Sequence, residues 1–278
     1  MSTDLIGKTV AVTGASGRLG QALLRSLQAQ GAEVIALSSS RSAVVIAAED
    51  EPEPETGSGQ KAPAQAVKTV LWQVGEEQAL APWLAQVDIL VINHGVNVMG
   101  DRTPAAIHNS YEINAFSGWR LLELFLERVE TQARTQAQNQ DQTPSDRQTS
   151  TPEVWVNTSE AESNPAFSPL YELSKRTLGD LVTLRRLDAP CPIRKLILGP
   201  FKSDLNPVGV MSADWVAERI VALAVAGRRN VIVTINPLTF VTFPLKEFYV
   251  SSYFRLFTRS PNPSPTQSPT HNPASKPD

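Results

Sequence analysis

The sequence has 278 residues, of which 41% are hydrophobic, so it can bury a substantial core in one large domain. Its formal net charge of -3 gives no general attraction to a polyanion, which argues against a nucleic-acid partner. The single cysteine, Cys191, cannot form a disulfide within the chain, and the first residues show no secretory signal pattern. Both features favour a reducing, cytoplasmic location.

Seven short apolar runs alternate with stretches of helical periodicity. The runs are 9–14, 32–38, 68–74, 87–95, 153–159, 193–200 and 230–237. Between most of them, apolar residues recur at three-to-four spacing, as at Leu19, Leu23 and Leu27. Strands that are apolar almost continuously are typical of a parallel sheet covered by helices on both faces. The sequence therefore predicts a doubly wound, mostly parallel α/β fold of about seven strands.

Two polar segments interrupt this alternation, near 41–66 and near 130–152. Both are rich in polar residues and proline, so we expect loop insertions that contact solvent. The last residues, 259–278, are rich in proline and serine, and this composition predicts disorder. We therefore expect one domain over 1–258 with two insertions and a disordered tail.

A glycine-rich turn, "TGASGRLG", joins the first predicted strand to the first predicted helix. Such a turn lets the backbone approach a pyrophosphate, and the N-terminus of a helix offers amides and a partial positive charge. The sequence therefore predicts a Rossmann-type dinucleotide site. The predicted contacts are Gly14, Ser16, Gly17, Arg18, Leu19 and Gly20.

The second predicted strand ends without the carboxylate that usually holds the ribose hydroxyls of NAD. It ends instead in a run that contains Ser38, Ser39 and Arg41. Hydroxyl groups and a guanidinium suit a 2′-phosphate, with Arg18 as a second cation. We therefore predict NADP(H) as the cofactor rather than NAD. The alternative is that Arg41 only begins a solvated loop.

A tyrosine and a lysine lie four residues apart at the start of a predicted helix, in "YELSK". On a helix this spacing places Tyr171 and Lys175 on the same face. A free phenol, with a pKa of about 10, is a poor base at neutral pH, and a nearby ammonium group stabilises its phenolate form. The pair is therefore a candidate for proton transfer. The alternative is a tyrosine packed beneath the aliphatic stem of a lysine.

Five motifs stand in order along the chain: "TGASGRLG", "INHG", "YEINAFSG", "VWVNTSEAES" and "YELSK". Their order and rough spacing resemble the short-chain dehydrogenase/reductase family over almost everything from Lys8 to about Ile235. In that family, the tyrosine gives a proton to a carbonyl oxygen, or takes one from an alcohol, while a hydride passes to or from nicotinamide. The resemblance implies this role for Tyr171.

The same resemblance implies roles for other residues. It implies that Lys175 binds the nicotinamide ribose and lowers the tyrosine pKa, that Ser159 hydrogen-bonds the substrate oxygen, and that Asn114 holds a water in a proton relay. Further cofactor contacts implied by the family pattern are Asn93, Gly95, Lys175, Pro200, Phe201 and Ser203.

The chain departs from the family pattern at four places, one of which is the reversal of the usual PG to Gly199 and Pro200. The glycines follow GxxGxxG spacing, which is commoner in longer, epimerase-like members, yet no substrate domain follows. His94 replaces a small residue, and it either contacts a ligand or is an ordinary hydrogen-bonded histidine. Glu160 stands where the family serine often lies, so the substrate-oxygen position belongs either to Ser159 or to Glu160.

An apolar segment at 238–257 carries more aromatic and aliphatic groups than a surface tail would tolerate. If the part after Pro244 is helical, Glu247, Ser251 and Arg255 form a narrow polar stripe. Its charges argue against a membrane-spanning helix. The segment is a lid over an apolar substrate, a subunit interface of a homo-oligomer, or a peripheral membrane contact.

Several stretches, such as "RKLILGPFKSDLNPVGVMSADWVA", also resemble sequences labelled bifunctional sterol desaturase/short-chain dehydrogenase. The three histidines, His94, His108 and His271, are scattered singly, so the residues do not support the desaturase half of that label. No metal site is predicted.

The sequence therefore favours an NADP(H)-dependent oxidoreductase that interconverts a carbonyl and an alcohol on an apolar, lipid-like small molecule. One alternative is an NADP(H)-binding sensor or scaffold without turnover, which Glu160 at the serine position would suit. A second alternative, suggested by the GxxGxxG spacing, is an epimerase or dehydratase of nucleotide sugars.

Overall fold

The computed structural model describes residues 4–39, 45–46, 65–138, 151–203, 205–206 and 208–259. Its centre is a seven-stranded sheet of order β5-β2-β1-β6-β7-β8-β9, in which every neighbouring pair is parallel. The strands are β1 (Thr9–Thr13), β2 (Glu33–Ser38), β5 (Lys68–Leu71), β6 (Ile89–Ile92), β7 (Glu153–Asn157), β8 (Ile193–Leu198) and β9 (Asn230–Val233). All seven predicted strands are present.

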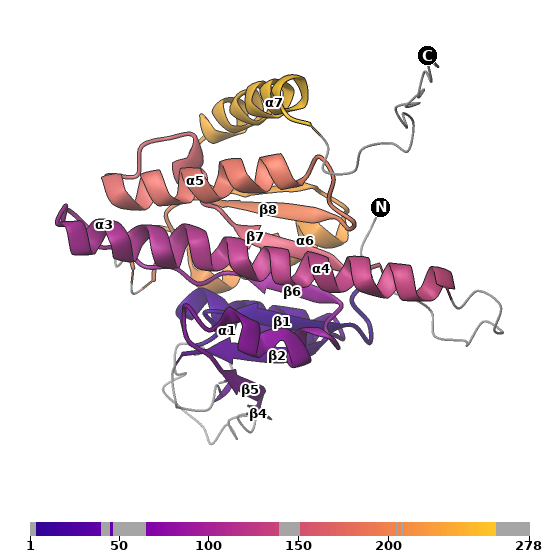
Figure 1. Cartoon of the computed structure of the whole chain (residues 1–278). Helices are drawn as coiled ribbons and strands as arrows, with labels where there is room; N and C mark the ends of the chain where they lie inside the picture. Colours follow the sequence, from indigo (N-terminus) through magenta and orange to yellow (C-terminus); the bar gives the residue numbers. More distant parts are fainter. Residues whose placement is uncertain are drawn as a thin grey trace, which may run out of the picture.

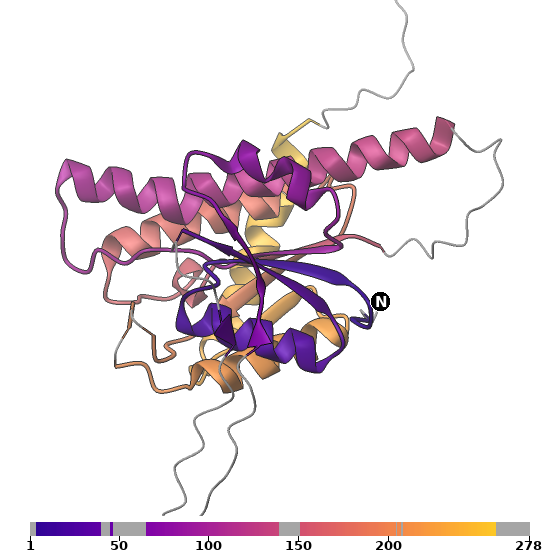
Figure 2. The same ribbon diagram turned by 90° about the horizontal axis from the view of Figure 1, so that it is seen from below.

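Helices cover both faces of the sheet, as the sequence predicted. α1 (Arg18–Ala29) and α6 (Ala213–Val225) lie on one face, while α4 (Ser117–Gln138) and α5 (Pro169–Arg185) lie on the other (Figure 1, Figure 2). The shorter elements are η1 (Glu77–Leu80), α2 (Ala81–Leu84), α3 (Pro104–Tyr111), the π-helical turn η2 (Glu112–Phe116) and the 3-10 turn η3 (Glu160–Glu162). The result is a three-layered, doubly wound fold.

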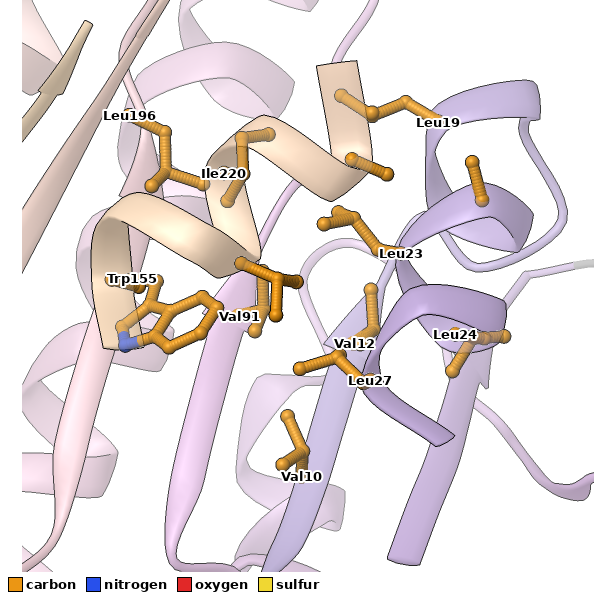
Figure 3. Close-up of a cluster of buried hydrophobic side chains, with 14 of the residues drawn as sticks. Val10, Val12, Leu19, Leu23, Leu24, Leu27, Val91, Trp155, Leu196 and Ile220 are labelled. Atoms are coloured by element: carbon orange, nitrogen blue, oxygen red, sulfur yellow. The ribbon is translucent and has the colours of Figure 1, made fainter. Parts of the chain in front are cut away.

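The face beneath α1 and α6 is a close-packed apolar cluster (Figure 3). Leu23 and Leu27 of α1 lie with Val12 and Trp155 of the sheet and Ile220 of α6, and all five are fully buried. Burying each leucine contributes roughly 1.5–3 kcal/mol. This cluster fixes α1, and therefore the glycine turn at its N-terminus, against the centre of the sheet.

The strand order reverses at β1, which pairs with β2 on one side and with β6 on the other. In an open parallel sheet, ligands bind in the crevice at the carboxyl ends of the strands where the order reverses. The segments that follow β1 and β6 begin at Gly14 and Asn93. The topology therefore brings the glycine turn and the "INHG" motif together.

The two predicted insertions differ in part from the structure. Within 41–66, β3 (Val45–Ile46) pairs with β4 (Gln65–Ala66) as a short antiparallel ladder, and the residues between them lie outside the described ranges. Within 130–152, α4 continues to Gln138, so the loop prediction was wrong for its first residues. Ala, Gln and Arg are good helix formers, and they extend α4 into solvent without an apolar face.

The apolar C-terminal segment forms α7 (Thr239–Phe257), which lies against α5 at the edge of the molecule (Figure 1). Helix formation starts before Pro244, earlier than the sequence suggested. Among the described residues, none of the helices combines the length and the apolar character that crossing a bilayer requires. The tail after Arg259 lies outside the described residues.

A buried charge cluster joins α7 to the layer beneath it. Glu162 of η3 accepts hydrogen bonds from Lys195 of β8 at 2.9 Å and from Lys246 of α7 at 2.8 Å. The side chains of Glu162 and Lys195 are both fully buried. A buried carboxylate is costly unless it is paired in this way. Although burial opposes ionisation, the two ammonium groups hold the pKa of Glu162 below its ordinary value.

We predict that Gly179→Ala destabilises the protein, although alanine is the better residue in a helix by about 1 kcal/mol. A Cβ at Gly179 of α5 would lie 2.1 Å from Glu162 Oε2, and Glu162 cannot move aside without breaking its ion pairs. Breaking a buried pair should cost roughly 2–4 kcal/mol and lower Tm by about 5–15 °C. Thermal unfolding of Gly100→Ala is the control, because its added Cβ has no neighbour within 4 Å. Equal Tm values for the two variants would contradict the prediction.

Candidate functional site

Thr13, the last residue of β1, connects the two strands that meet at the reversal of strand order. Its hydroxyl oxygen accepts hydrogen bonds from the backbone amides of Asn93 at 2.8 Å and His94 at 3.2 Å, and it lies 2.9 Å from His94 Nδ1. The His94 ring also packs edge-on against Trp72, with the ring centroids 5.2 Å apart. Burial, and then the charge on Lys175, lower the His94 pKa to about 3. His94 is therefore a neutral packing residue at neutral pH.

The glycine turn has the close backbone packing that a dinucleotide site requires. Gly14 has a φ of +63°, and an added Cβ there would lie 2.9 Å from the Cα of His94. A Cβ at Gly20 would lie 2.2 Å from the carbonyl oxygen of Gly14. Gly17 caps α1 without a side-chain hydrogen bond, so backbone amides form the N-terminal surface of this helix. These residues fit the pyrophosphate of a dinucleotide.

The other predicted cofactor contacts differ in how exposed their side chains are. Ser16 and Arg18 are exposed beside the glycine turn, whereas the Leu19 side chain is buried in the core, so Leu19 could contact a ligand only through its backbone. At the end of β2, Ser38 is buried and Ser39 is exposed. Arg41 lies outside the described residues.

Asn114 is buried in η2, at the junction of α3 and α4. Its Oδ1 accepts a hydrogen bond from Val96 N at 2.7 Å, and its Nδ2 donates to Val96 O at 2.9 Å and to Ser174 Oγ at 3.0 Å. π-helical turns of this kind often occur at functional sites. Gly95 leaves the space beside Asn114, because a Cβ there would lie 3.0 Å from Asn114 Oδ1 and 3.5 Å from Lys175 Nζ.

Lys175 is buried on α5, and its ammonium group donates to the carbonyl oxygen of Asn157 at 3.0 Å. The Asn157 side chain in turn donates to Asn93 Oδ1 at 3.1 Å. Burial lowers the Lys175 pKa to about 8, although the charge of Glu162 opposes this shift. The structure therefore brings three predicted residues together, Gly95, Asn114 and Lys175, at the ends of β6 and β7.

Tyr171 lies one helical turn before Lys175, and the lysine Nζ is 5.9 Å from the centroid of its ring. The Ser159 side chain lies close enough to the Tyr171 hydroxyl to lower the tyrosine pKa, and its own hydroxyl donates to the carbonyl oxygen of Leu198 at 3.4 Å. Burial raises the Tyr171 pKa, and the Ser159 hydroxyl only partly opposes this effect. The expected lowering of the tyrosine pKa by Lys175 is thus not present in this state of the protein, because burial dominates. Tyr171 is a phenol here, the form that can donate a proton.

The structure separates Ser159 from Glu160. Ser159, in a left-handed conformation with a φ of 73°, faces Tyr171. The Glu160 carboxylate turns the other way and accepts hydrogen bonds from the hydroxyls of Thr234 and Thr239, each at 2.8 Å. Glu160 therefore holds the start of α7, and Ser159 is the residue beside the candidate acid.

The loop after β8 closes on itself near the start of α5. Pro200 O accepts from the amide of Val210 at 3.1 Å, Phe201 bridges to Met211, and Ser203 Oγ accepts from the amide of Asn206 at 3.2 Å. Asn97, in the segment after β6, connects this loop to α5: it donates to Leu205 O at 3.4 Å and accepts from Ser168 Oγ at 2.7 Å. Contact of Pro200, Phe201 and Ser203 with a cofactor stays a prediction.

Three residues that the sequence did not single out belong to this site: Thr13, Asn157 and Ser174. Thr13 and Asn157 are polar residues at the carboxyl ends of buried strands, a position that could have identified them. Ser174 carries no comparable sequence signal, because it stands at a variable position inside the "YELSK" motif, between Tyr171 and Lys175. Within the described ranges, no group of three or more His, Cys, Asp or Glu side chains could hold a metal ion.

The parallel sheet, the glycine turn and the strand order define a Rossmann-type α/β protein. A family model described as short chain dehydrogenase matches residues 8–137. A monoglucosyldiacylglycerol epimerase from Synechocystis sp. is 54% identical over 256 residues, which are 92% of this chain and 56% of that protein. The chain thus spans about half the length of this relative. The family model and this relative both make the chain similar to the short-chain dehydrogenase/reductase family.

Two solved structures share the fold. A short chain dehydrogenase from Burkholderia cenocepacia J2315 in complex with NADP has a TM-score of 0.64 and 16% identity, over 92% of this chain and 100% of that chain. A short-chain dehydrogenase from Sphingobium yanoikuyae in complex with NADPH has a TM-score of 0.62 and 16% identity, over 93% of this chain and 99% of that chain. The predicted fold class is confirmed, and the family model and the epimerase relative support the predicted family.

We predict that Lys175→Met stabilises the protein at pH 7 but not near pH 10. The folded pKa of about 8 lies below the ordinary value of 10.5, so the unfolded chain binds more protons between these values. Stability therefore rises with pH across this window, and below it the buried charge costs roughly 3 kcal/mol at most. Chemical denaturation at both pH values measures the difference.

Lys246→Met is the control of opposite sign. Its ion pairs with Glu162 and Asp180 raise the Lys246 pKa despite burial, so its removal should lower stability at pH 7. If Lys175→Met destabilises the protein at neutral pH, or if its effect does not depend on pH, then burial of the Lys175 charge does not cost folding free energy.

Proposed function

We propose that this chain is an NADP(H)-dependent enzyme that inverts the configuration of a carbinol carbon in the sugar headgroup of a glycolipid, through a transient carbonyl. The observation that carries this proposal is the proximity of the Tyr171 and Ser159 hydroxyls, one helical turn from Lys175. Two hydroxyls held side by side can both contact one substrate oxygen. The glycolipid substrate is supported by the 54% identity to a monoglucosyldiacylglycerol epimerase.

When bound, the cofactor supplies a hydride acceptor in its oxidised form and a hydride donor in its reduced form. The residues of this chain then move the proton. As the alcohol is oxidised, Tyr171 in its phenolate form takes the hydroxyl proton, and as the carbonyl is reduced, the phenol returns it. Ser159 donates a hydrogen bond to the same oxygen in both steps. Oxidation followed by reduction leaves tyrosine and cofactor as they began.

The residues around Tyr171 and Ser159 support this cycle. The glycine turn and Gly95 leave room for backbone contact with a dinucleotide. Lys175 places an ammonium group where the ribose hydroxyls and the phenolate would meet it, and Asn157 orients that group. Asn114, fixed by Val96 and Ser174, holds the segment after β6 in place.

An apolar substrate is supported by side chains on the loops around the site. Phe167, just before α5, is 98% exposed, and Val208 and Val210, in the loop after β8, are 86% and 67% exposed. Large apolar groups exposed together favour an apolar ligand or surface. Acyl chains could lie along them while the sugar reaches Tyr171.

The sensor or scaffold alternative loses its main argument, because Glu160 is engaged with Thr234 and Thr239 and does not replace the serine. A simple dehydrogenase is the second candidate, since the same residues would serve a single oxidation or reduction. The two candidates differ in their products: an epimerase accumulates no reduced cofactor, whereas a dehydrogenase reduces one cofactor for each substrate oxidised.

We predict that the purified protein, with NADP and monoglucosyldiacylglycerol, forms the sugar epimer without net NADPH. In D2O the new C–H bond should carry no deuterium, because the hydride returns from the cofactor rather than from solvent. Tyr171→Phe should lower this rate by about 10²–10⁴-fold and leave NADPH binding intact. Chromatography of the released sugar and mass spectrometry measure both quantities.

Tyr249→Phe, which removes an exposed hydroxyl on α7, is the matched control and should retain activity in detergent solution. Stoichiometric NADPH would favour the dehydrogenase candidate, and full activity of Tyr171→Phe would remove Tyr171 as the proton carrier.

NADP(H) is preferred because the described end of β2 carries hydroxyls and no carboxylate. We predict that Ser39→Asp weakens NADPH binding by about tenfold or more, since a carboxylate repels a 2′-phosphate and instead binds ribose hydroxyls. NADH binding should strengthen or stay unchanged. Fluorescence titration compares the two cofactors, with Ser39→Ala as the control; a uniform loss of both would show that Ser39 does not face the ribose.

A further inference from the structure

The outward face of α7 is apolar, the reverse of an ordinary surface helix. Its two central charges, Lys246 and Glu247, point inward, where Lys246 pairs with Glu162 and Glu247 pairs with Lys195. Large apolar side chains therefore project outward and are between 50% and 78% exposed. They are Leu245, Phe248, Tyr249, Tyr253, Leu256 and Phe257. The sequence suggested a polar stripe of Glu247, Ser251 and Arg255 beside these groups. In the structure, the Glu247 carboxylate points inward and is paired with Arg186 and Lys195.

A cavity of about 470 Å³ lies between α7, the end of α5 and the residues before β9. Leu187, Pro244 and Phe248 form its apolar wall, and Arg229 and Arg255 lie at its exposed rim. Ser251 and Ser252 of α7 also line the cavity, and their hydroxyls can donate hydrogen bonds. The cavity thus combines an apolar wall with cationic and hydroxyl groups.

The cavity is lined by more positive than negative side chains, so it favours an anion. A third guanidinium, Arg186, pairs with Glu247 at 3.0 Å, and the same carboxylate also accepts from Lys195 at 2.9 Å. The one carboxylate that lines the cavity, Glu247, is therefore already paired with Arg186, and it shares Lys195 with Glu162. Burial lowers the Arg186 pKa to about 10, the charge of Glu247 opposes this effect, and the nearby charge of Arg229 adds to it. An anion in the cavity would relieve the repulsion between the two guanidinium groups.

We propose that α7 docks on the membrane surface and that the cavity beneath it binds the phosphate headgroup of an anionic phospholipid. The outward apolar groups would enter the boundary between headgroups and acyl chains, as amphipathic interfacial helices do. Arg229 and Arg255 would contact the phosphate, and Ser251 and Ser252 would donate hydrogen bonds to it. This site goes beyond the proposed activity and does not depend on it.

Charge complementarity favours an anionic bilayer over a second copy of the chain. A symmetric contact through α7 buries the same surface of both copies, so that surface must complement itself. Arg255 of each copy would meet no free carboxylate on the partner helix, because the one carboxylate of α7, Glu247, is already paired with Arg186 and Lys195. An anionic lipid surface instead attracts Arg255.

The proposed docking face is joined to the candidate active site by hydrogen bonds. Thr239, the first residue of α7, donates to Glu160 at 2.8 Å and accepts from Asn164 Nδ2 at 2.9 Å. Both partners belong to the turn that follows Ser159. A membrane-bound α7 would therefore fix the orientation of this turn, and with it the site, relative to the lipid surface.

Vesicle co-sedimentation of the full chain, without cofactor or glycolipid, tests the proposal. We expect binding to phosphatidylcholine vesicles that strengthens when phosphatidylglycerol is added and weakens with salt. Arg229→Glu with Arg255→Glu should weaken binding to the anionic vesicles by at least about tenfold. Arg102→Glu with Arg134→Glu makes the same change in net charge at exposed sites elsewhere and should retain binding.

A third variant measures how much the apolar side chains of α7 contribute to vesicle binding. Tyr249→Asn with Leu256→Asn should weaken binding to both kinds of vesicle, with Tm unchanged because both side chains are exposed. The proposal is wrong if the wild type binds neither vesicle or if both charge pairs lose binding equally. It is also wrong if inorganic phosphate displaces the protein from the vesicles much more strongly than sodium chloride of the same ionic strength, which would indicate a site for soluble anions. It is also wrong if light scattering shows a dimer that the Asn variant dissociates. None of these results depends on epimerase activity.

Discussion

The structure depends on one buried carboxylate. Glu162 lies in the turn that follows Ser159, accepts hydrogen bonds from Lys195 in the sheet and Lys246 in α7, and fits only because Gly179 of α5 has no side chain. A buried ion pair is not in itself strongly stabilising, but removing one partner leaves an unpaired charge at high cost. The pairing therefore specifies one arrangement of sheet, turn and two helices, and that arrangement sets Ser159 against Tyr171.

The same burial explains the electrostatics of the candidate site. A low-dielectric environment disfavours both charged forms, so the pKa of Tyr171 rises while that of Lys175 falls. The folded protein is less stable because the Lys175 charge is buried, and an anionic group of a bound ligand would reduce this loss of stability. Stability given up at a functional site is a common exchange for activity.

The sequence predicted the sheet well because strands buried on both faces must be apolar, and the motifs predicted Asn114, Ser159, Tyr171 and Lys175 as neighbours. It could not predict the pairing of Glu162 with Lys195 and Lys246, since nothing local connects a charge in a turn with charges in a strand and a distant helix. For the same reason the inward charges of α7 were missed. The polar end of α4 was predicted to be a loop because it has no apolar face; the helical propensity of its residues extends the helix there instead.

The central claim is that one tyrosine moves a proton while a hydride leaves and returns at one sugar carbon. The most direct measurement is a single turnover with NADP and monoglucosyldiacylglycerol deuterated at the carbinol carbon, stopped by acid and analysed by mass spectrometry of the cofactor. The account predicts deuterium in the reduced nicotinamide before the epimer accumulates. Epimer formation with deuterium exchanged into water and never found in the cofactor would contradict it.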